Sequence, residues 1–229
     1  MGTQLLFPTV MYTADLEPPE EVSLGMFEYF KKYYARNRNI YRQNRGGNIT
    51  GDVTGDFQIA SKQQFFWLNN QVLHHCYQYL TEFGVDTNLV NLYASKSWPV
   101  ICDNNGGGVE KHNHPNSHLS VVFYLQSDMG VGGDLIVYID DNHPTRTLPI
   151  CTFIPQMNFL SVDYSAFKPI VNQLVIFPSR LWHEVIEYHG NMQRYSVTYD
   201  ILITHKKGSL EDNEMGFIHP DSWVNLNGD

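Results

Sequence analysis

Apolar and polar residues repeat at a helical period in two stretches of the first third of the chain. The first stretch runs from Glu20 to Arg36 and follows Pro18 and Pro19, which are tolerated at a helix start. Its apolar positions are Val22, Met26, Phe27, Phe30 and Tyr34. The pattern predicts a helix over residues 20–36.

The second helical stretch covers residues 61–83. Ser61 is a suitable N-cap with Gln64 at the capping-box position, and Gly84 is a typical residue after a helix end. The apolar stripe of this predicted helix consists of Phe65, Leu68, Val72, Cys76, Tyr79 and Leu80.

Two further segments before residue 85 lack a helical period. Residues 4–14 are predicted to be an extended strand, because Pro8 and the β-branched residues disfavour a helix. Residues 46–56 are rich in Gly, Asn, Asp and Thr, so they are predicted to form a loop that could serve as a lid.

After Val85 the pattern changes to short apolar runs separated by turn-forming residues. These runs are residues 89–94, 98–102, 119–125, 134–139, 152–155, 173–177 and 195–203. Strands of this length and spacing are typical of a sandwich or jelly roll. We therefore expect a mainly β fold with flanking helices. Residues 1–84 would form an N-terminal strand and helices that pack on the barrel, and residues 85–229 the β core, in a single structural unit.

The charge balance narrows the classes of partner. The 229 residues include 15 Lys and Arg and 24 Asp and Glu, which gives a net charge of −9. This balance argues against a general binder of nucleic acid or anionic membrane. Six basic residues lie between Lys31 and Arg45, either as a contact surface for an acidic partner or, the interpretation we favour, as a solvated helix end.

The sequence predicts a cytoplasmic protein. No apolar stretch approaches the roughly 20 residues needed to span a bilayer, and the first residues lack the basic start of a signal peptide. The three cysteines, Cys76, Cys102 and Cys151, are far apart and are expected to be buried thiols in a reducing compartment.

Histidines provide the first indication of chemistry. In an extended strand His112 and His114 would point to the same face, an arrangement suited to chelating one metal ion. This pair needs a third ligand from elsewhere, and His183, which follows an apolar strand and a Pro-Ser turn, is a candidate. Eleven residues later, Arg194 and Ser196 would share one strand face, where a guanidinium and a hydroxyl suit a carboxylate.

Taken together, these motifs resemble the Fe(II)- and 2-oxoglutarate-dependent dioxygenases. The resemblance rests on HNHPNSHLSVVFYL at residues 112–125, a GGDLI strand at residues 132–136, the FPS element that leads to His183, and the R-x-S motif at Arg194. Their order over roughly residues 85–204 is more specific than any one of them. The resemblance implies a double-stranded β-helix, or jelly roll, with flanking helices.

The resemblance also implies roles for individual residues. His112 and His183 would bind Fe(II). Arg194, assisted by Ser196 and Tyr124, would bind the distal carboxylate of 2-oxoglutarate. The reaction would use O2, release succinate and CO2, and hydroxylate a C–H bond of a peptidyl or small-molecule substrate.

One position departs from the family pattern, because His114 stands where the usual triad has Asp or Glu. His114 could be the third ligand of a three-histidine site, Asp134 could reach the metal instead, or the ion could be held by two histidines and water. His118 has the same parity, but a turn at Pro115-Asn116 is expected to remove it from the site.

Two other function classes stay open at this point. One is a three-histidine dioxygenase of cupin type that does not use 2-oxoglutarate, which explains His114 but leaves Arg194 without a task. The other is a non-catalytic jelly-roll binding protein, which explains neither residue. Trp98 and Trp182 could wall a pocket or fill the core, and residues 140–170 could form its rim.

Overall fold

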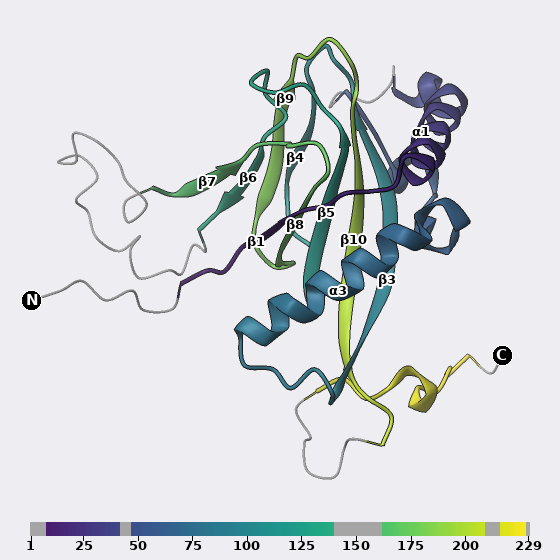
Figure 1. Ribbon diagram of the computed structural model, residues 1–229, viewed down its shortest axis with the longest axis vertical. Helices are drawn as coiled ribbons and strands as arrows, with labels where there is room; N and C mark the ends of the chain where they lie inside the picture. The colour runs from purple at the N-terminus through teal and green to yellow at the C-terminus, as the bar shows by residue number, and fades with distance from the viewer. Residues whose placement is uncertain (1–7, 42–46, 140–161, 209–215, 228–229) are drawn as a thin grey trace, which may run out of the picture.

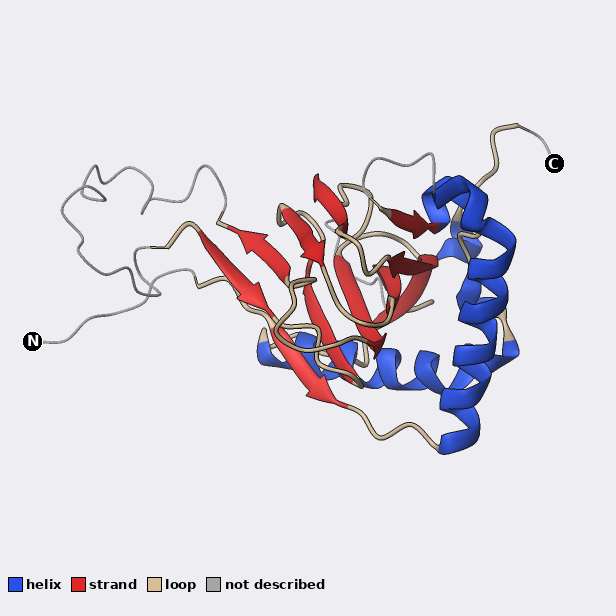
Figure 2. Cartoon of the chain, turned by 90° about the horizontal axis from the view of Figure 1, so that it is seen from above, coloured by secondary structure: helices blue, strands red, loops and turns tan. Residues whose placement is uncertain are grey.

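The computed structural model describes residues 8–41, 47–139, 162–208 and 216–227. Over these residues the chain forms two antiparallel β-sheets, and the helices gather on one side of them (Figures 1 and 2). The helices are α1 (Glu20–Tyr41), α2 (Gly51–Thr54) and α3 (Phe66–Glu82), with 3-10 turns η1 (Ile59–Ser61), η2 (Gln63–Phe65) and η5 (Pro220–Ser222).

In the described part of the chain, one sheet has six strands in the order β1-β8-β5-β10-β3-β2 and the other has four in the order β4-β9-β6-β7. The strands of the larger sheet are β1 (Tyr12–Asp15), β2 (Asn48–Thr50), β3 (Val90–Cys102), β5 (Leu119–Gln126), β8 (Gln173–Pro178) and β10 (Arg194–His205). Those of the smaller sheet are β4 (Gly107–His112), β6 (Leu135–Tyr138), β7 (Tyr164–Phe167) and β9 (His183–Tyr188). From β3 to β10 the chain passes repeatedly from one sheet to the other, which is the jelly-roll path that the sequence predicts.

Apolar side chains form one cluster outside the barrel and two inside it. The outer cluster joins α1 and α3 to the larger sheet, where Phe30 stacks on Tyr195 with ring centroids 4.9 Å apart. Inside, Tyr124 packs with residues of β6 and β8, and Trp98 and Tyr188 pack between β3 and β9. The helices therefore close one face of the larger sheet, and its other face lines the barrel.

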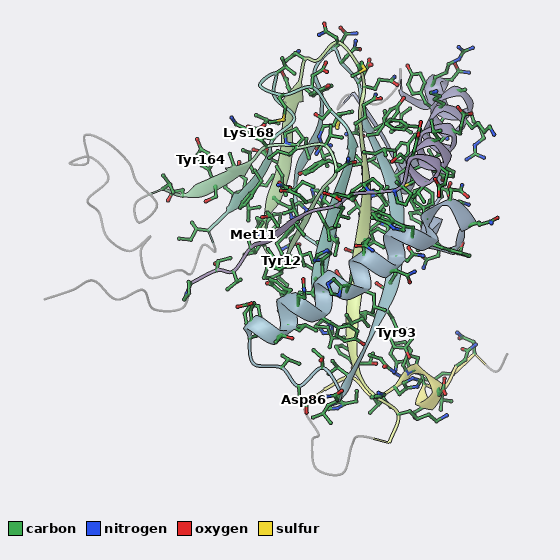
Figure 3. The ribbon with its side chains drawn as sticks, in the orientation of Figure 1. Met11, Tyr12, Asp86, Tyr93, Tyr164 and Lys168 are labelled. Carbon is green, nitrogen blue, oxygen red and sulfur yellow. The ribbon has the colours of Figure 1, made fainter. Side chains whose placement is uncertain are left out.

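The N-terminal third contributes strands as well as helices. β1 pairs with β8, and β2 pairs with the end of β3, so both belong to the larger sheet. Tyr12 of β1 also reaches α3, because its hydroxyl lies 2.9 Å from Nδ1 of His75 and donates to Gln78 at 2.6 Å (Figure 3). The division of the chain into an N-terminal part, residues 1–84, and a β core, residues 85–229, stays a prediction.

The C-terminal residues are tied to β3. The Tyr93 hydroxyl lies 2.7 Å from Nε2 of His219, just before η5 (Figure 3). No helix of the described residues is long and apolar enough to cross a membrane.

Several element predictions were wrong in detail. Residues 46–56 are not simply a loop, because β2 and α2 lie within them. The second helix begins at Phe66 rather than at Ser61, which ends a 3-10 turn and gives its hydroxyl to Gln58 O instead of capping a helix. The predicted strands at 89–94 and 98–102 are one strand, β3, and the strand predicted at 152–155 lies outside the described residues.

The packing of Phe30 generates a prediction about stability. Phe30 is fully buried against Tyr195, so Phe30→Ala should leave a cavity and lower the free energy of unfolding by about 3–5 kcal/mol. Urea unfolding measures the change. Leu24→Ala on the exposed face of the same helix is the control, and it should cost about 0.5 kcal/mol or less. Equal effects of the two changes would contradict this account of the outer cluster.

Candidate active site

Three histidines meet at one end of the barrel. Pairing of β4 with β9 places His112 directly opposite His183, with ring centroids 4.4 Å apart. The ring of His114 lies 5.0 Å from that of His112 and 5.1 Å from that of His183. One ligand atom from each residue lies within 4.8 Å of the others, so the three side chains are close enough together for one metal ion.

The second nitrogen of each ring explains which atom would bind the metal. Nδ1 of His112 lies 2.7 Å from the Glu110 carbonyl, and Nδ1 of His183 lies 2.8 Å from the Leu181 carbonyl. A carbonyl oxygen can only accept, so both Nδ1 atoms carry the proton and Nε2 keeps its lone pair. Partners of this kind orient metal-binding imidazoles in many proteins.

His114 is held differently. β4 ends at His112, so strand alternation alone does not place His114. Instead its backbone N–H donates to the Ser179 carbonyl at 2.8 Å, and its Nδ1 lies 2.6 Å from Oδ1 of Asp200. Three serine hydroxyls, those of Ser117, Ser120 and Ser179, form a buried chain that continues to this pair.

The serine chain explains two of the sequence motifs. The Ser117 and Ser120 hydroxyls donate to the Ser179 hydroxyl at 2.8 Å and 3.0 Å. Ser179 belongs to the FPS element, so hydrogen bonds join this element to the histidine motif beside the three histidines. Ser179 and Asp200 were not predicted as site residues, although Asp200 lies an even number of residues from Arg194 and could have been placed on the same strand face.

Burial keeps His183 neutral. The pKa of His183 is lowered to about 3, mainly by burial and also by the neighbouring rings of His112 and His114. A neutral imidazole is the form that binds metal, so this residue is ready to act as a ligand at neutral pH.

A buried cation lies deeper in the barrel. Arg194, at the start of β10, is 1% exposed, and no carboxylate of the described residues pairs with it. One of its nitrogens donates to the Ser196 hydroxyl at 3.3 Å and approaches Sγ of Cys102 at 3.7 Å, while Nε is buried without a hydrogen-bond partner. An unpaired buried guanidinium is costly, so the arrangement suits an anionic ligand.

Tyr124 connects the guanidinium to the histidines. The Arg194 guanidinium lies 4.9 Å from the centroid of the Tyr124 ring, and the buried Tyr124 hydroxyl has no partner among the described residues. Tyr124 packs with Phe177, whose ring is 5.0 Å from that of His183. Gly133 has a positive φ of 75°, and a Cβ there would lie 3.0 Å from Arg194 Cδ, so a side chain would crowd the guanidinium.

Residues 96–200 match the model of a protein family described as “Putative 2OG-Fe(II) oxygenase”. The match contains the three histidines, Tyr124, Arg194 and Asp200. This part of the chain is similar to the 2OG-Fe(II) oxygenases. That family implies Fe(II) as cofactor and 2-oxoglutarate as cosubstrate, and the buried polar atoms of Arg194 and Tyr124 that lack a hydrogen-bond partner fit a carboxylate. No curated protein matches the chain.

Solved structures share the fold of this chain at low sequence identity. AviO1 from Streptomyces viridochromogenes Tue57 has a TM-score of 0.55 and 9% identity, and the alignment covers 85% of this chain and 90% of AviO1. A prolyl hydroxylase from Trichoplax adhaerens, in complex with a hypoxia-inducible factor peptide, has a TM-score of 0.52 and 16% identity over 84% and 83% of the two chains. A Pseudomonas putida prolyl-4-hydroxylase has a TM-score of 0.51 and 14% identity over 84% and 92%. These likenesses confirm the double-stranded β-helix.

The other residues weighed from the sequence have clear positions. His118 lies outside the histidine cluster, and its Nδ1 accepts a hydrogen bond from Ile203 N–H at 2.9 Å. Asp134 is also absent from that cluster among the described residues. Trp98 is buried with its ring 5.5 Å from that of His114, whereas Trp182 is 44% exposed. Most of the predicted rim at 140–170 lies outside the described residues.

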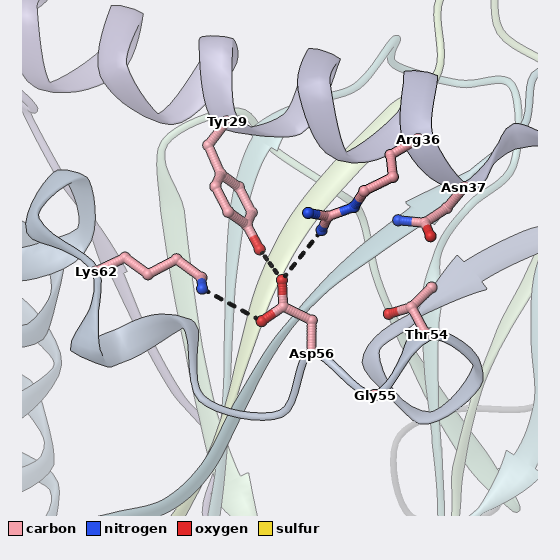
Figure 4. Close-up of a pocket in the computed structure, with 7 residues that line it drawn as sticks. All are labelled: Tyr29, Arg36, Asn37, Thr54, Gly55, Asp56 and Lys62. Atoms are coloured by element: carbon pink, nitrogen blue, oxygen red, sulfur yellow. Dashed lines mark hydrogen bonds and ion pairs between the residues drawn. The ribbon is translucent and has the colours of Figure 1, made fainter.

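A separate polar pocket of about 350 Å³ lies between α1 and the segment before η1 (Figure 4). Asp56 accepts a hydrogen bond from the Tyr29 hydroxyl at 2.5 Å and lies 3.8 Å from Arg36 and 3.5 Å from Lys62. The Asp56 carboxylate already pairs with both cations, so these contacts are best explained as holding α1 against the segment before η1.

The neutral state of His183 generates a prediction about pH. An unfolded histidine binds a proton near pH 6.5, but folded His183 does so only near pH 3, so the unfolded chain binds more protons between these values. The free energy of unfolding of the metal-free oxygenase should therefore fall as the pH falls through this window, by at most about 1.4 kcal/mol per pH unit from this residue. Urea unfolding at a series of pH values measures the slope.

The control for this pH effect is a variant that removes no titratable group. His183→Gln should make stability depend less on pH, whereas Leu24→Ala on the exposed face of α1 should leave the dependence unchanged. The same slope in wild type and His183→Gln would show that residue 183 is not the cause.

Proposed function

We propose that this chain hydroxylates a C–H bond of a peptidyl or small-molecule substrate, with O2 as oxidant and conversion of 2-oxoglutarate to succinate and CO2. One observation carries the proposal. A three-histidine cluster and a buried guanidinium without a carboxylate partner occupy the same barrel, connected through Phe177 and Tyr124. A purely structural barrel requires neither feature.

Each residue has a proposed task. His112, His114 and His183 would hold Fe(II) through Nε2, and the ion would supply the oxidative chemistry. Arg194 would bind the distal carboxylate of 2-oxoglutarate, because a guanidinium pairs with it bidentately. The hydroxyls of Ser196 and Tyr124 would complete the hydrogen bonds, and burial of the group would exclude water.

The substrate and the compartment follow from weaker observations. One structure of similar fold contains a peptide, which supports a peptidyl substrate as one choice beside small molecules. The net charge of −9 argues against nucleic acid. Cys76 and Cys102 are free and buried, which agrees with the cytoplasmic site of action that we propose.

His114 favours a second candidate function. A three-histidine dioxygenase that does not use 2-oxoglutarate would explain a neutral third ligand, but it would leave the buried Arg194 without a partner. Succinate release, measured with and without Fe(II), separates the two candidates. Succinate formed only with iron supports the 2-oxoglutarate reaction.

Metal binding is the first prediction of this proposal. Wild type should bind about one Fe(II) per chain, and His112→Ala or His183→Ala should abolish binding because each removes an imidazole ligand. Anaerobic dialysis followed by metal analysis measures the occupancy. His74→Ala is the control and should bind as wild type does, whereas full occupancy in a His112→Ala, His183→Ala double variant would rule out this site.

Binding of 2-oxoglutarate is the second prediction. Arg194→Ala should cost about 3–5 kcal/mol of cosubstrate affinity, and Arg194→Lys should cost less because it keeps the charge but loses the bidentate fork. Titration of 2-oxoglutarate into the anaerobic Fe(II)-loaded protein, followed by its charge-transfer absorbance, measures the affinity.

The control for this titration is Arg180→Ala. Arg180 is exposed, so removing it tests whether any nearby positive charge is sufficient. Its affinity should stay within about threefold of wild type, as expected for an exposed charge. Equal affinity in wild type and Arg194→Ala would remove the main support for 2-oxoglutarate as cosubstrate and favour the second candidate.

A further inference from the structure

The position that departs from the usual iron triad has a carboxylate directly behind it. His114 stands where Asp or Glu is usual, and its Nδ1 lies 2.6 Å from Oδ1 of Asp200. A carboxylate, that of Asp200, is therefore still present, but it contacts His114 instead of facing the proposed metal position.

Asp200 distinguishes His114 from the other two histidines. His112 and His183 direct Nδ1 to neutral backbone carbonyls two residues earlier in the chain, at Glu110 and Leu181. Nδ1 of His114 instead faces a carboxylate, that of Asp200 on β10. A hydrogen bond to an ionised group is shorter and stronger than one between neutral groups.

The surroundings hold Asp200 in place. It is 9% exposed, and the Ser120 hydroxyl lies 3.4 Å from its Oδ1 and 3.1 Å from Nδ1 of His114. Because Ser120 also donates to Ser179, whose carbonyl accepts from the His114 backbone, both ends of His114 are fixed by the same group of residues.

We propose that Asp200 is a positioning residue that acts through His114. It holds the imidazole in the tautomer with the proton on Nδ1 and supplies beside the metal the negative charge that a carboxylate ligand would supply. The inference rests on the proposed metal site. The proposal accounts for three histidines in place of the usual triad with an acid, since the negative charge lies on Asp200 behind His114 and not on the third ligand itself.

Asp200→Asn tests the role of the charge. It keeps the size of the side chain and one acceptor oxygen, but it removes the charge and adds an amide that can donate to Nδ1. Co(II) is the probe, and its affinity, measured by competition with a chelator, should fall about 10–100-fold. Asp128→Asn is the matched control, because Asp128 caps the 191–192 turn in the same barrel without contacting a histidine, and it should bind Co(II) as wild type does.

A double-variant cycle tests whether Asp200 acts through His114. In a His114→Ala background, Asp200→Asn should have little further effect on Co(II) affinity, because the partner is gone. Equal losses of Co(II) affinity in the wild-type and His114→Ala backgrounds would overturn the proposal and indicate a general effect of the charge.

Ring-nitrogen NMR of the metal-free protein gives a readout that does not depend on metal. Wild-type His114 should carry its proton on Nδ1, and Asp200→Asn should give a mixture of tautomers. Thermal unfolding checks that the variant folds, and Asp200→Ala replaces it if it does not. Co(II) bound equally by wild type and the Asp200 variant overturns this inference alone. Absence of Co(II) and Fe(II) binding in wild type overturns the metal site itself.

Discussion

Alternation of side chains along β10 separates the two environments on which this molecule depends. Tyr195, Val197, Tyr199 and Ile201 point to the helices and belong to the outer apolar cluster. Arg194, Ser196, Thr198 and Asp200 have the opposite parity and are buried inside the barrel. Because successive residues of a strand face opposite sides, one strand anchors the helices and also presents the polar groups of the site. A shift of register by one residue would turn the apolar side chains into the barrel and remove these polar groups from it.

The polar groups inside the barrel are unequally satisfied, and this inequality indicates where ligands bind. Asp200, the three serines and the histidine Nδ1 atoms have partners within the protein. Arg194 Nε and the Tyr124 hydroxyl do not. Buried polar atoms without partners reduce stability, so a site that keeps them is organised for a ligand that completes the hydrogen bonds. The satisfied groups orient the histidines, and the unsatisfied ones are the groups to which we assign the proposed cosubstrate.

The proposed metal site and the proposed carboxylate site draw on residues of both sheets. His112 and His183 are cross-strand neighbours in the smaller sheet, whereas Arg194 and Tyr124 belong to the larger sheet. Phe177 and Tyr124 connect the two sites by packing. A ligand that reaches from one sheet to the other would therefore contact the histidines as well as Arg194 and Tyr124. The likeness of the fold to prolyl hydroxylases fits this architecture, while the third histidine and its carboxylate partner are features of this chain's own residues.

The residue types of the candidate site and most of the strands could be predicted from the sequence. His112, His183 and the Arg194-Ser196 pair were readable, because motif order and the two-residue alternation of a strand are local properties. β7 and β9 were missed because their exposed faces give mixed polar and apolar patterns, and β2 because a short Gly-rich segment resembles a loop until β3 pairs with it. The position of His114 beside Asp200 could not be predicted from the sequence. They are 86 residues apart and meet because β10 pairs with β5, a contact between distant segments that no local pattern encodes.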